Sequence, residues 1–186
     1  MANVYDFLGD QADYFMKSSW QVYTDASGTR QYVGKTGNEK TISPNLEVAE
    51  WFDNTTGVQY LYALGISKFD LMCSFSFMQI LDPNALSICW NADLDTSDTT
   101  FNYLYFGTDP NELGTYEWRF VGQGKSGLSI TFVIRKGMAI PNGDWTTGAA
   151  GEWTNLPITL RSMQDTGITN TKRDLAYFMI QKRALS

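Results

Sequence analysis

The sequence predicts a mainly β protein: an antiparallel β-sandwich or barrel with one flanking α-helix, an extended N-terminal arm and a long loop. Three observations lead to this. One segment, residues 67–80, alternates strictly between apolar and polar side chains. Two pairs of strand-like segments flank turns that contain glycine, at 25–28 and 122–127. A helical pattern occurs once, at 82–90. The length of 186 residues predicts a single domain over residues 1–186.

The alternating segment 67–80 predicts a strand with one face in a core and one face in a wetter environment. Successive side chains of a strand point to opposite faces. The apolar face is therefore made of Phe69, Leu71, Cys73, Phe75 and Phe77, and the more polar face is made of Lys68, Asp70, Met72, Ser74, Ser76 and Met78. On the more polar face, Lys68 is expected to pair with Asp70.

The other elements follow from turn and cap signals. Residues 1–16 form an N-terminal arm that mixes aromatic residues with three aspartates. Residues 34–40 have the composition of a loop, and 34–66 as a whole are expected to be a long loop or extended segment with a role in ring stacking. Asp82 is a natural N-cap for a helix that starts at Pro83. Residues 91–100 predict an acidic loop, and Pro157 predicts that its strand lies at an edge or bulge.

No residue pattern predicts catalysis, a cofactor or a metal. The chain has no histidine, which removes the commonest general base and metal ligand. Cys73 and Cys89 lie among apolar neighbours and are expected to be free core thiols. The Gly124–Ser126 segment lacks the first glycine of a phosphate-binding loop, and the Asp93–Asp98 segment lacks the glycine and glutamate of an EF-hand. We therefore expect a protein that is not an enzyme.

The charge is distributed unevenly along the chain. Between Phe69 and Trp118 there are eight acidic residues and no lysine or arginine, and the net charge of the whole chain is −6. A protein that grips nucleic acid places Lys and Arg against phosphates, so this balance argues against nucleic-acid binding. The first residues predict no secretory leader, and no apolar stretch is long enough for a membrane helix, so no membrane contact is expected.

The order of these features resembles the major tail tube protein of long-tailed, siphovirus-like bacteriophages. Four stretches carry the resemblance: the extended segment from Gly34 to Gly65, the strand and helix in "KFDLMCSFSFMQILDPNALSICW", the hairpin "YEWRFVGQGKSGLSITFVIRKG", and "GEWTNLPITLRSMQD" followed by "DLAYFMIQKR". The resemblance implies a β-sandwich that forms hexameric rings through a shared inner barrel. It also implies that the rings stack into a hollow tube through which genomic DNA passes without specific binding.

The resemblance also implies a location and partners. The protein would be assembled in the host cytoplasm into the virion tail, where its neighbours are copies of itself and the tail terminator, tape measure and distal tail proteins. An acidic lumen would repel DNA phosphates, and the polar face of residues 67–80 is the candidate lumen surface, with Asp70, Ser74 and Ser76. The residues expected to make subunit contacts are Tyr5, Phe7, Phe15, Trp51, Phe52 and Tyr60.

Two alternatives stay open at this stage. A monomeric carbohydrate-binding β-sandwich would use the aromatic residues, which include six tryptophans and ten tyrosines, as an exposed platform. A tail terminator or connector protein would form one ring and stop. The sequence does not separate these from a tube protein.

Overall fold

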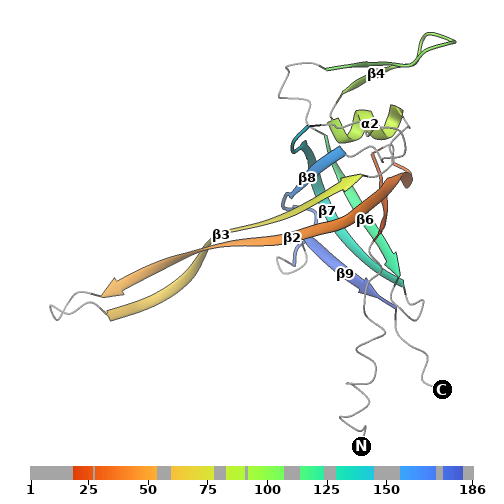
Figure 1. The fold of residues 1–186 in the computed structure, drawn as a ribbon. Coiled ribbons are helices and arrows are strands. Elements are labelled where there is room, and N and C mark those ends of the chain that lie inside the picture. Colours follow the sequence, from red (N-terminus) through yellow and green to blue (C-terminus); the bar gives the residue numbers. More distant parts are fainter. Residues whose placement is uncertain are drawn as a thin grey trace, which may run out of the picture.

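The computed structural model describes residues 19–26, 28–53, 60–77, 83–90, 92–106, 114–123, 129–144, 156–170 and 174–181. The elements in chain order are β1 (Gln21–Thr24), β2 (Gln31–Asp53), β3 (Tyr60–Phe77), α2 (Pro83–Trp90), β4 (Asp93–Asp95), β5 (Tyr103–Tyr105), β6 (Thr115–Gln123), β7 (Ser129–Pro141), β8 (Leu156–Ser162) and β9 (Ala176–Ile180). The predicted mainly β class with one flanking helix is confirmed (Figure 1). The predicted 1–16 arm lies outside the described residues.

Six strands close into an antiparallel barrel in the order β6-β1-β2-β3-β8-β7, because β6 and β7 also pair with each other. The closing ladder runs from Thr115 opposite Met138 to Gln123 opposite Ser129. The long β7 carries two partners on its other edge, β9 beside Ile130–Ile134 and β8 beside Gly137–Pro141. Closure removes the exposed edges that an open sheet would present along these segments.

The barrel is filled by the apolar faces of its strands. Phe75 is the centre of an aromatic cluster, with ring centroids 5.0 Å from both Phe77 and Phe120 in edge-to-face geometry. Helix α2 lies at one end of the barrel, where β3 finishes and β6 begins (Figure 1). Its buried Ala85 and Cys89 join the same core. The helix begins at Pro83 as predicted, whereas its expected cap Asp82 lies outside the described residues.

Strand β3 confirms the predicted alternation within the barrel wall. Leu71, Cys73, Phe75 and Phe77 are buried, and Met72, Ser74 and Ser76 between them are half-buried. The strand also begins seven residues earlier than expected, at Tyr60. Phe69 departs from the prediction: it is 49% exposed, because β3 has left the barrel at that point and no core faces it.

Three local predictions are corrected. Residues 34–40 are part of strand β2, and their loop-like composition coincides with a register shift between Thr36 and Lys40. The acidic segment 91–100 includes strand β4, which pairs with β5. Pro157 lies in an interior strand, but near its start, one residue before the last β7 pair, Pro141 opposite Ile158. Its carbonyl accepts a hydrogen bond of 3.0 Å from the Asn142 N–H, and the missing proline N–H leaves out only the return bond at the end of this ladder.

Candidate assembly surfaces

The largest surface feature is a two-stranded ribbon that projects from the barrel (Figure 1). It consists of residues 45–53 of β2 and 60–70 of β3, which pair with each other from Asn45–Asp70 outward to Asp53–Tyr60. Strand β3 pairs with β8 only from Met72 onward, and β2 pairs with β1 only up to Lys35. In the part of the chain that the structure describes, both outer edges of the ribbon therefore have no strand partner.

The ribbon exposes large apolar side chains on both faces. Leu46 lies opposite Phe69, and Phe52 lies opposite Leu61, so these four share one face. All four are about half exposed, as is Val48 on the same face. This face continues the one that carries Leu71 and Cys73 into the barrel core. Trp51, on the opposite face, is also exposed. An apolar surface of this kind on a soluble protein marks an interaction site.

The predicted contact residues fall into three groups. Trp51 and Phe52 are consecutive residues near the end of β2, and their side chains, on opposite faces of the ribbon, are each 53% exposed. Tyr60 is the first residue of β3, opposite Asp53. Tyr5, Phe7 and Phe15 lie outside the described residues. The structure thus brings three of the six predicted positions to the outer part of one ribbon.

The predicted lumen residues lie together on the outer surface of the barrel wall. The Ser74 and Thr159 hydroxyls share a hydrogen bond of 3.0 Å across the β3–β8 pair, and Ser76 lies opposite Pro157. Asp70 is only 7% exposed, and its carboxylate lies 2.8 Å from a guanidinium nitrogen of Arg161. Arg161 therefore pairs with Asp70, and the side chain of the expected partner, Lys68, lies outside what the structure describes. Because this arginine lies far away in sequence, the alternation within residues 67–80 contains no signal for it.

Strand β9 forms a second apolar edge that the sequence reasoning did not single out. It pairs with β7 on one side, and no other described strand pairs with its outer side. Phe178 stacks on the core residue Phe132 with a centroid distance of 4.7 Å, yet remains half exposed. Met179 and Ile180 are also exposed. The run is only five residues long and is followed by basic residues, so its sequence alone does not indicate an apolar surface.

The hairpin of β4 and β5 forms a third surface, beyond α2 (Figure 1). The Tyr103 and Tyr105 rings are stacked with centroids 6.3 Å apart, and both are exposed. Asp93 lies directly opposite Tyr105, and Asp95 lies opposite Tyr103. Phe106 contacts Trp90 of α2, with ring centroids 5.3 Å apart, and this contact ties the hairpin to the helix.

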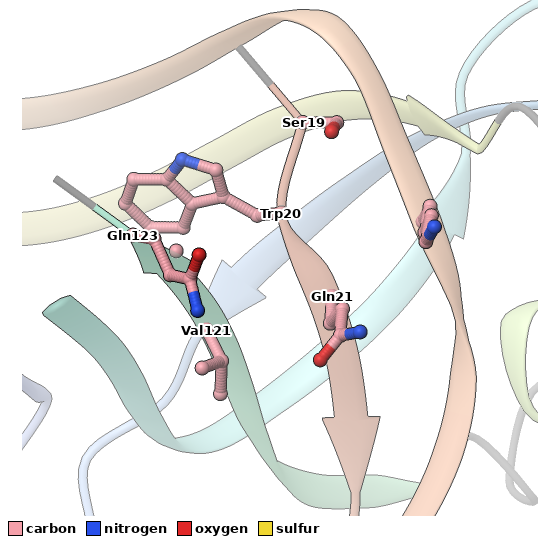
Figure 2. A pocket seen from close by; sticks show the side chains of 7 residues that line it. Ser19, Trp20, Gln21, Val121 and Gln123 are labelled. Atoms are coloured by element: carbon pink, nitrogen blue, oxygen red, sulfur yellow. The ribbon is translucent and has the colours of Figure 1, made fainter. Parts of the chain in front are cut away.

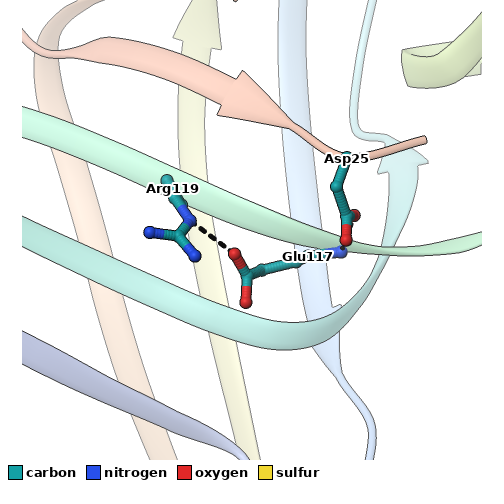
Figure 3. Close-up of polar contacts among 3 residues, drawn as sticks. All are labelled: Asp25, Glu117 and Arg119. Atoms are coloured by element: carbon teal, nitrogen blue, oxygen red, sulfur yellow. Dashed lines mark hydrogen bonds and ion pairs between the residues drawn. The ribbon is translucent and has the colours of Figure 1, made fainter. Parts of the chain in front are cut away.

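The turn between β1 and β2 is fixed to β6 by polar contacts (Figure 3). The Asp25 carboxylate accepts a hydrogen bond of 2.6 Å from the Glu117 backbone N–H, and Glu117 forms an ion pair with Arg119. Arg119 also lines two shallow cavities of about 290 and 310 Å³ together with Tyr23 and Arg30. Because the Arg119 charge is balanced by Glu117, these cavities do not present two free cations.

Two features of the described residues bear on metal and thiol chemistry. They include no cluster of three or more potential metal ligands. Cys73 and Cys89 are buried free thiols, as predicted, and burial raises the pKa of each to about 12. Such thiols stay protonated and are poor nucleophiles at neutral pH. Across the same residues no helix is long and apolar enough to cross a membrane.

Comparison with known proteins does not assign the chain. No protein-family model matches it, and no curated protein matches it. The function is therefore inferred from the residues and surfaces described above.

Proposed function

We propose that this protein is a structural virion protein that assembles into hexameric rings, stacked as the hollow tail tube of a long-tailed bacteriophage. The ring number and the DNA-conduit role come from the sequence resemblance. The observation that carries self-assembly is the β2–β3 ribbon, which extends the core-facing surface of the barrel to positions with no cover from the rest of the described chain. A second copy of the chain supplies that cover.

Two different apolar surfaces support a head-to-tail contact between copies. The ribbon carries Phe52 and Phe69, whereas β9 carries Phe178 and Ile180 on a separate strand edge. Contact between two unlike surfaces of identical subunits is heterologous, and it closes into rings or continues as a filament. Both surfaces also carry open backbone edges, which favour strand pairing between chains.

The electrostatics favour passage of DNA without binding. The net charge is −6, and a surface of that sign repels phosphates. Because Asp70 is paired with Arg161, the candidate lumen face with Ser74 and Ser76 contributes little free negative charge. The exposed Asp93 and Asp98 of the segment around β4 contribute more. We therefore place the acidic lining preferentially on residues 93–98.

Negative-stain electron microscopy of the purified protein over a series of concentrations and salt tests the proposal. Hollow tubes of uniform width are expected, and their repeat gives the ring spacing. Rings that never stack would instead indicate a terminator or connector. A monomer at every concentration would contradict self-assembly. It would favour the carbohydrate-binding alternative, for which the stacked Tyr103 and Tyr105 rings are the candidate platform, and glycan screening would follow.

The ribbon itself is tested by Trp51→Ser combined with Phe52→Ser. These side chains lie outside the barrel, so the unassembled chain keeps its circular dichroism spectrum and melting temperature, whereas tubes no longer form. A matched control is Met163→Ser, which removes an exposed apolar side chain outside the ribbon and β9. Tubes formed by the ribbon variant at wild-type concentration would show that the ribbon is not an assembly surface.

A further inference from the structure

The outer face of the barrel across β1, β6, β7 and β9 carries an apolar hollow. Strand pairing places Val121 opposite Thr131 and Thr131 opposite Met179, so the three side chains share this face. The side chains that alternate with those of β6 and β7 point into the core. The shared face lines a cavity of about 310 Å³, the Arg30 cavity, whose lining residues are Tyr23, Arg30, Arg119, Val121, Thr131 and Met179.

Arg30 is the free charge of this cavity. The other cation, Arg119, is paired with Glu117, and Figure 3 shows their side chains turned toward each other. The nearby Asp25 carboxylate is engaged by the Glu117 N–H. Arg30 is exposed and forms no ion pair with any residue that the structure describes. The Arg30 cavity therefore combines an apolar surface with one guanidinium that lacks a carboxylate, its strongest hydrogen-bonding partner.

A second cavity, of about 230 Å³, borders the first on the same face (Figure 2). Val121 lines both cavities, and Gln21 lies directly opposite it on β1, with Lys35 on the far side of Gln21. Trp20 also lines this second cavity, but its ring belongs to the core. The remaining side chains of the lining are polar: Ser19, Gln21, Lys35 and Gln123. An aromatic side chain therefore buries more apolar surface in the Arg30 cavity, beside Met179.

One face of the ribbon has the complementary composition. Successive side chains of a strand alternate between faces, so Glu50 lies on the same face as Val48 and Phe52. Glu50 is exposed and forms no ion pair with any described residue, and the Phe52 ring is 53% exposed. The two positions are about 7 Å apart along the strand. An aromatic ring and a free carboxylate therefore project side by side from the ribbon.

The ribbon and the Arg30 cavity of one chain lie apart. Glu50 is five residues beyond Asn45, where the ribbon begins, which corresponds to about 16 Å along the strand. Figure 1 shows that the ribbon points away from the barrel strands that line the cavity. The exposed Phe52 and the free Arg30 of one chain therefore do not meet, and a second copy is needed to bring such a pair together.

We propose that Phe52 of one copy occupies the Arg30 cavity of a second copy, where Glu50 of the same ribbon pairs with Arg30. This inference rests on the proposed self-assembly and names both sides of the contact. A cavity of about 150 Å³ accepts a benzene ring, so the Arg30 cavity has room for the phenyl group. Tyr23 and Tyr32, whose rings meet edge to face at 5.5 Å, add aromatic surface beside it. Because the two surfaces are unlike, each copy binds one neighbour and is bound by another.

A charge reversal at the two positions tests the contact. Arg30→Glu and Glu50→Arg each place like charges in it, and each is expected to raise the protein concentration needed for assembly at least about tenfold. The double variant Arg30→Glu/Glu50→Arg restores an opposite pair and is expected to assemble near the wild-type concentration. Lys35→Glu and Asp93→Lys are matched controls, because each reverses an exposed charge outside the contact.

Mixing the two single variants shows whether the contact joins different copies. In an equimolar mixture, the ribbon of Arg30→Glu still carries Glu50 and meets the unchanged Arg30 of the other variant. The reverse contact joins the two introduced charges, which are also opposite. Sedimentation and electron microscopy are therefore expected to show assembly for the mixture at concentrations where neither variant assembles alone. Circular dichroism melts of both variants should match the wild type, because both side chains are exposed.

The outcomes separate this inference from the proposed function. If the wild type forms tubes and both single variants form them at the same concentration, the contact is wrong and the tube function stands. If the single variants fail and neither the double variant nor the mixture recovers, Arg30 and Glu50 are not partners. If the wild type forms only single rings and the mixture recovers those rings, the contact stands and the tube function is wrong. A wild type that never leaves the monomer overturns both.

Discussion

The alternating pattern of strand β3 runs from the barrel wall into the base of the ribbon, but what covers the apolar face differs between the two. Within the barrel wall, Leu71 is 9% exposed, and two residues earlier on the same face Phe69 is 49% exposed. The inner half packs against β8 and the aromatic core, whereas the outer half pairs with β2 alone. Alternation along a strand therefore specifies which side chains share a face, and long-range pairing decides whether that face is buried.

The comparison also separates stability from assembly. The barrel holds the aromatic cluster around Phe75 and the buried end of α2, so it carries the free energy of folding. A two-stranded ribbon in water has marginal stability of its own. Its apolar residues gain burial only when a second chain covers them. Substitutions in the barrel should change unfolding, and substitutions in the ribbon should change association.

The largest expected effect is on unfolding of the barrel. Phe120 is 1% exposed and packs against Phe75, so Phe120→Ala is expected to lower the free energy of unfolding by about 3–5 kcal/mol. The matched control is Phe52→Ala on the ribbon. This variant should change the free energy of unfolding of the unassembled chain by less than about 0.5 kcal/mol. Urea unfolding at low protein concentration measures both. Equal losses would show that the ribbon belongs to the folding core.

High pH should also act on the barrel rather than on the ribbon. Burial raises the pKa of Cys73 and Cys89 from 9.0 to about 12, so the folded chain keeps these protons while the unfolded chain loses them. The stability contributed by the two protonated thiols is therefore complete below pH 9 and is lost as the pH rises toward 12. Urea titrations at pH 8 and pH 10.5 measure how much unfolding free energy the wild type and Cys89→Ala each lose as the pH rises. The variant is expected to lose less, and an equal loss in both proteins would contradict a role for Cys89.

A smaller effect is expected at the ion pair of the barrel wall. Arg161→Ala leaves the 7% exposed Asp70 without its partner and should cost about 1–2 kcal/mol, a range reduced because Arg161 itself is half exposed. Lys136→Ala is the comparison, since its 3.4 Å pair with Asp165 is more exposed and should be worth less. Thermal melts rank the two variants. The reverse order would mean that Asp70 finds another partner.

The smallest expected effect lies in the turn between β1 and β2. Gly28 has a φ of 76°, and a Cβ added there would meet nothing within 4 Å. Gly28→Ala therefore tests backbone conformation alone and should cost about 1 kcal/mol. Gly28→Asn is expected to cost less, because asparagine adopts this conformation more readily. Chemical unfolding distinguishes them, and no loss in either variant would mean that the turn relaxes.

Much of the fold followed from local patterns. The alternating faces of residues 71–77, the helix start at Pro83 and the hairpin of β6 and β7 around residues 122–127 were predicted, although the strand predicted at 67–80 already begins at Tyr60. Segment 34–66 was predicted less well, because the glycines and lysines at 34–40 have the composition of a loop, whereas these residues belong to strand β2, which has a register shift between Thr36 and Lys40. The assembly surfaces were predicted in part: Trp51 and Phe52 were expected as contacts, whereas the edge of β9 was not.

The sequence by itself determined the β class, the two faces of each strand and the placement of acidic residues around Asp93, because these depend on neighbours a few positions apart. The tertiary structure decided the closure of the barrel by β6 and β7, the partner of Asp70, and the cavity that Trp20 shares with Lys35. Each of these joins residues far apart in the chain. Such contacts depend on the register of strand pairing, which a local pattern does not specify.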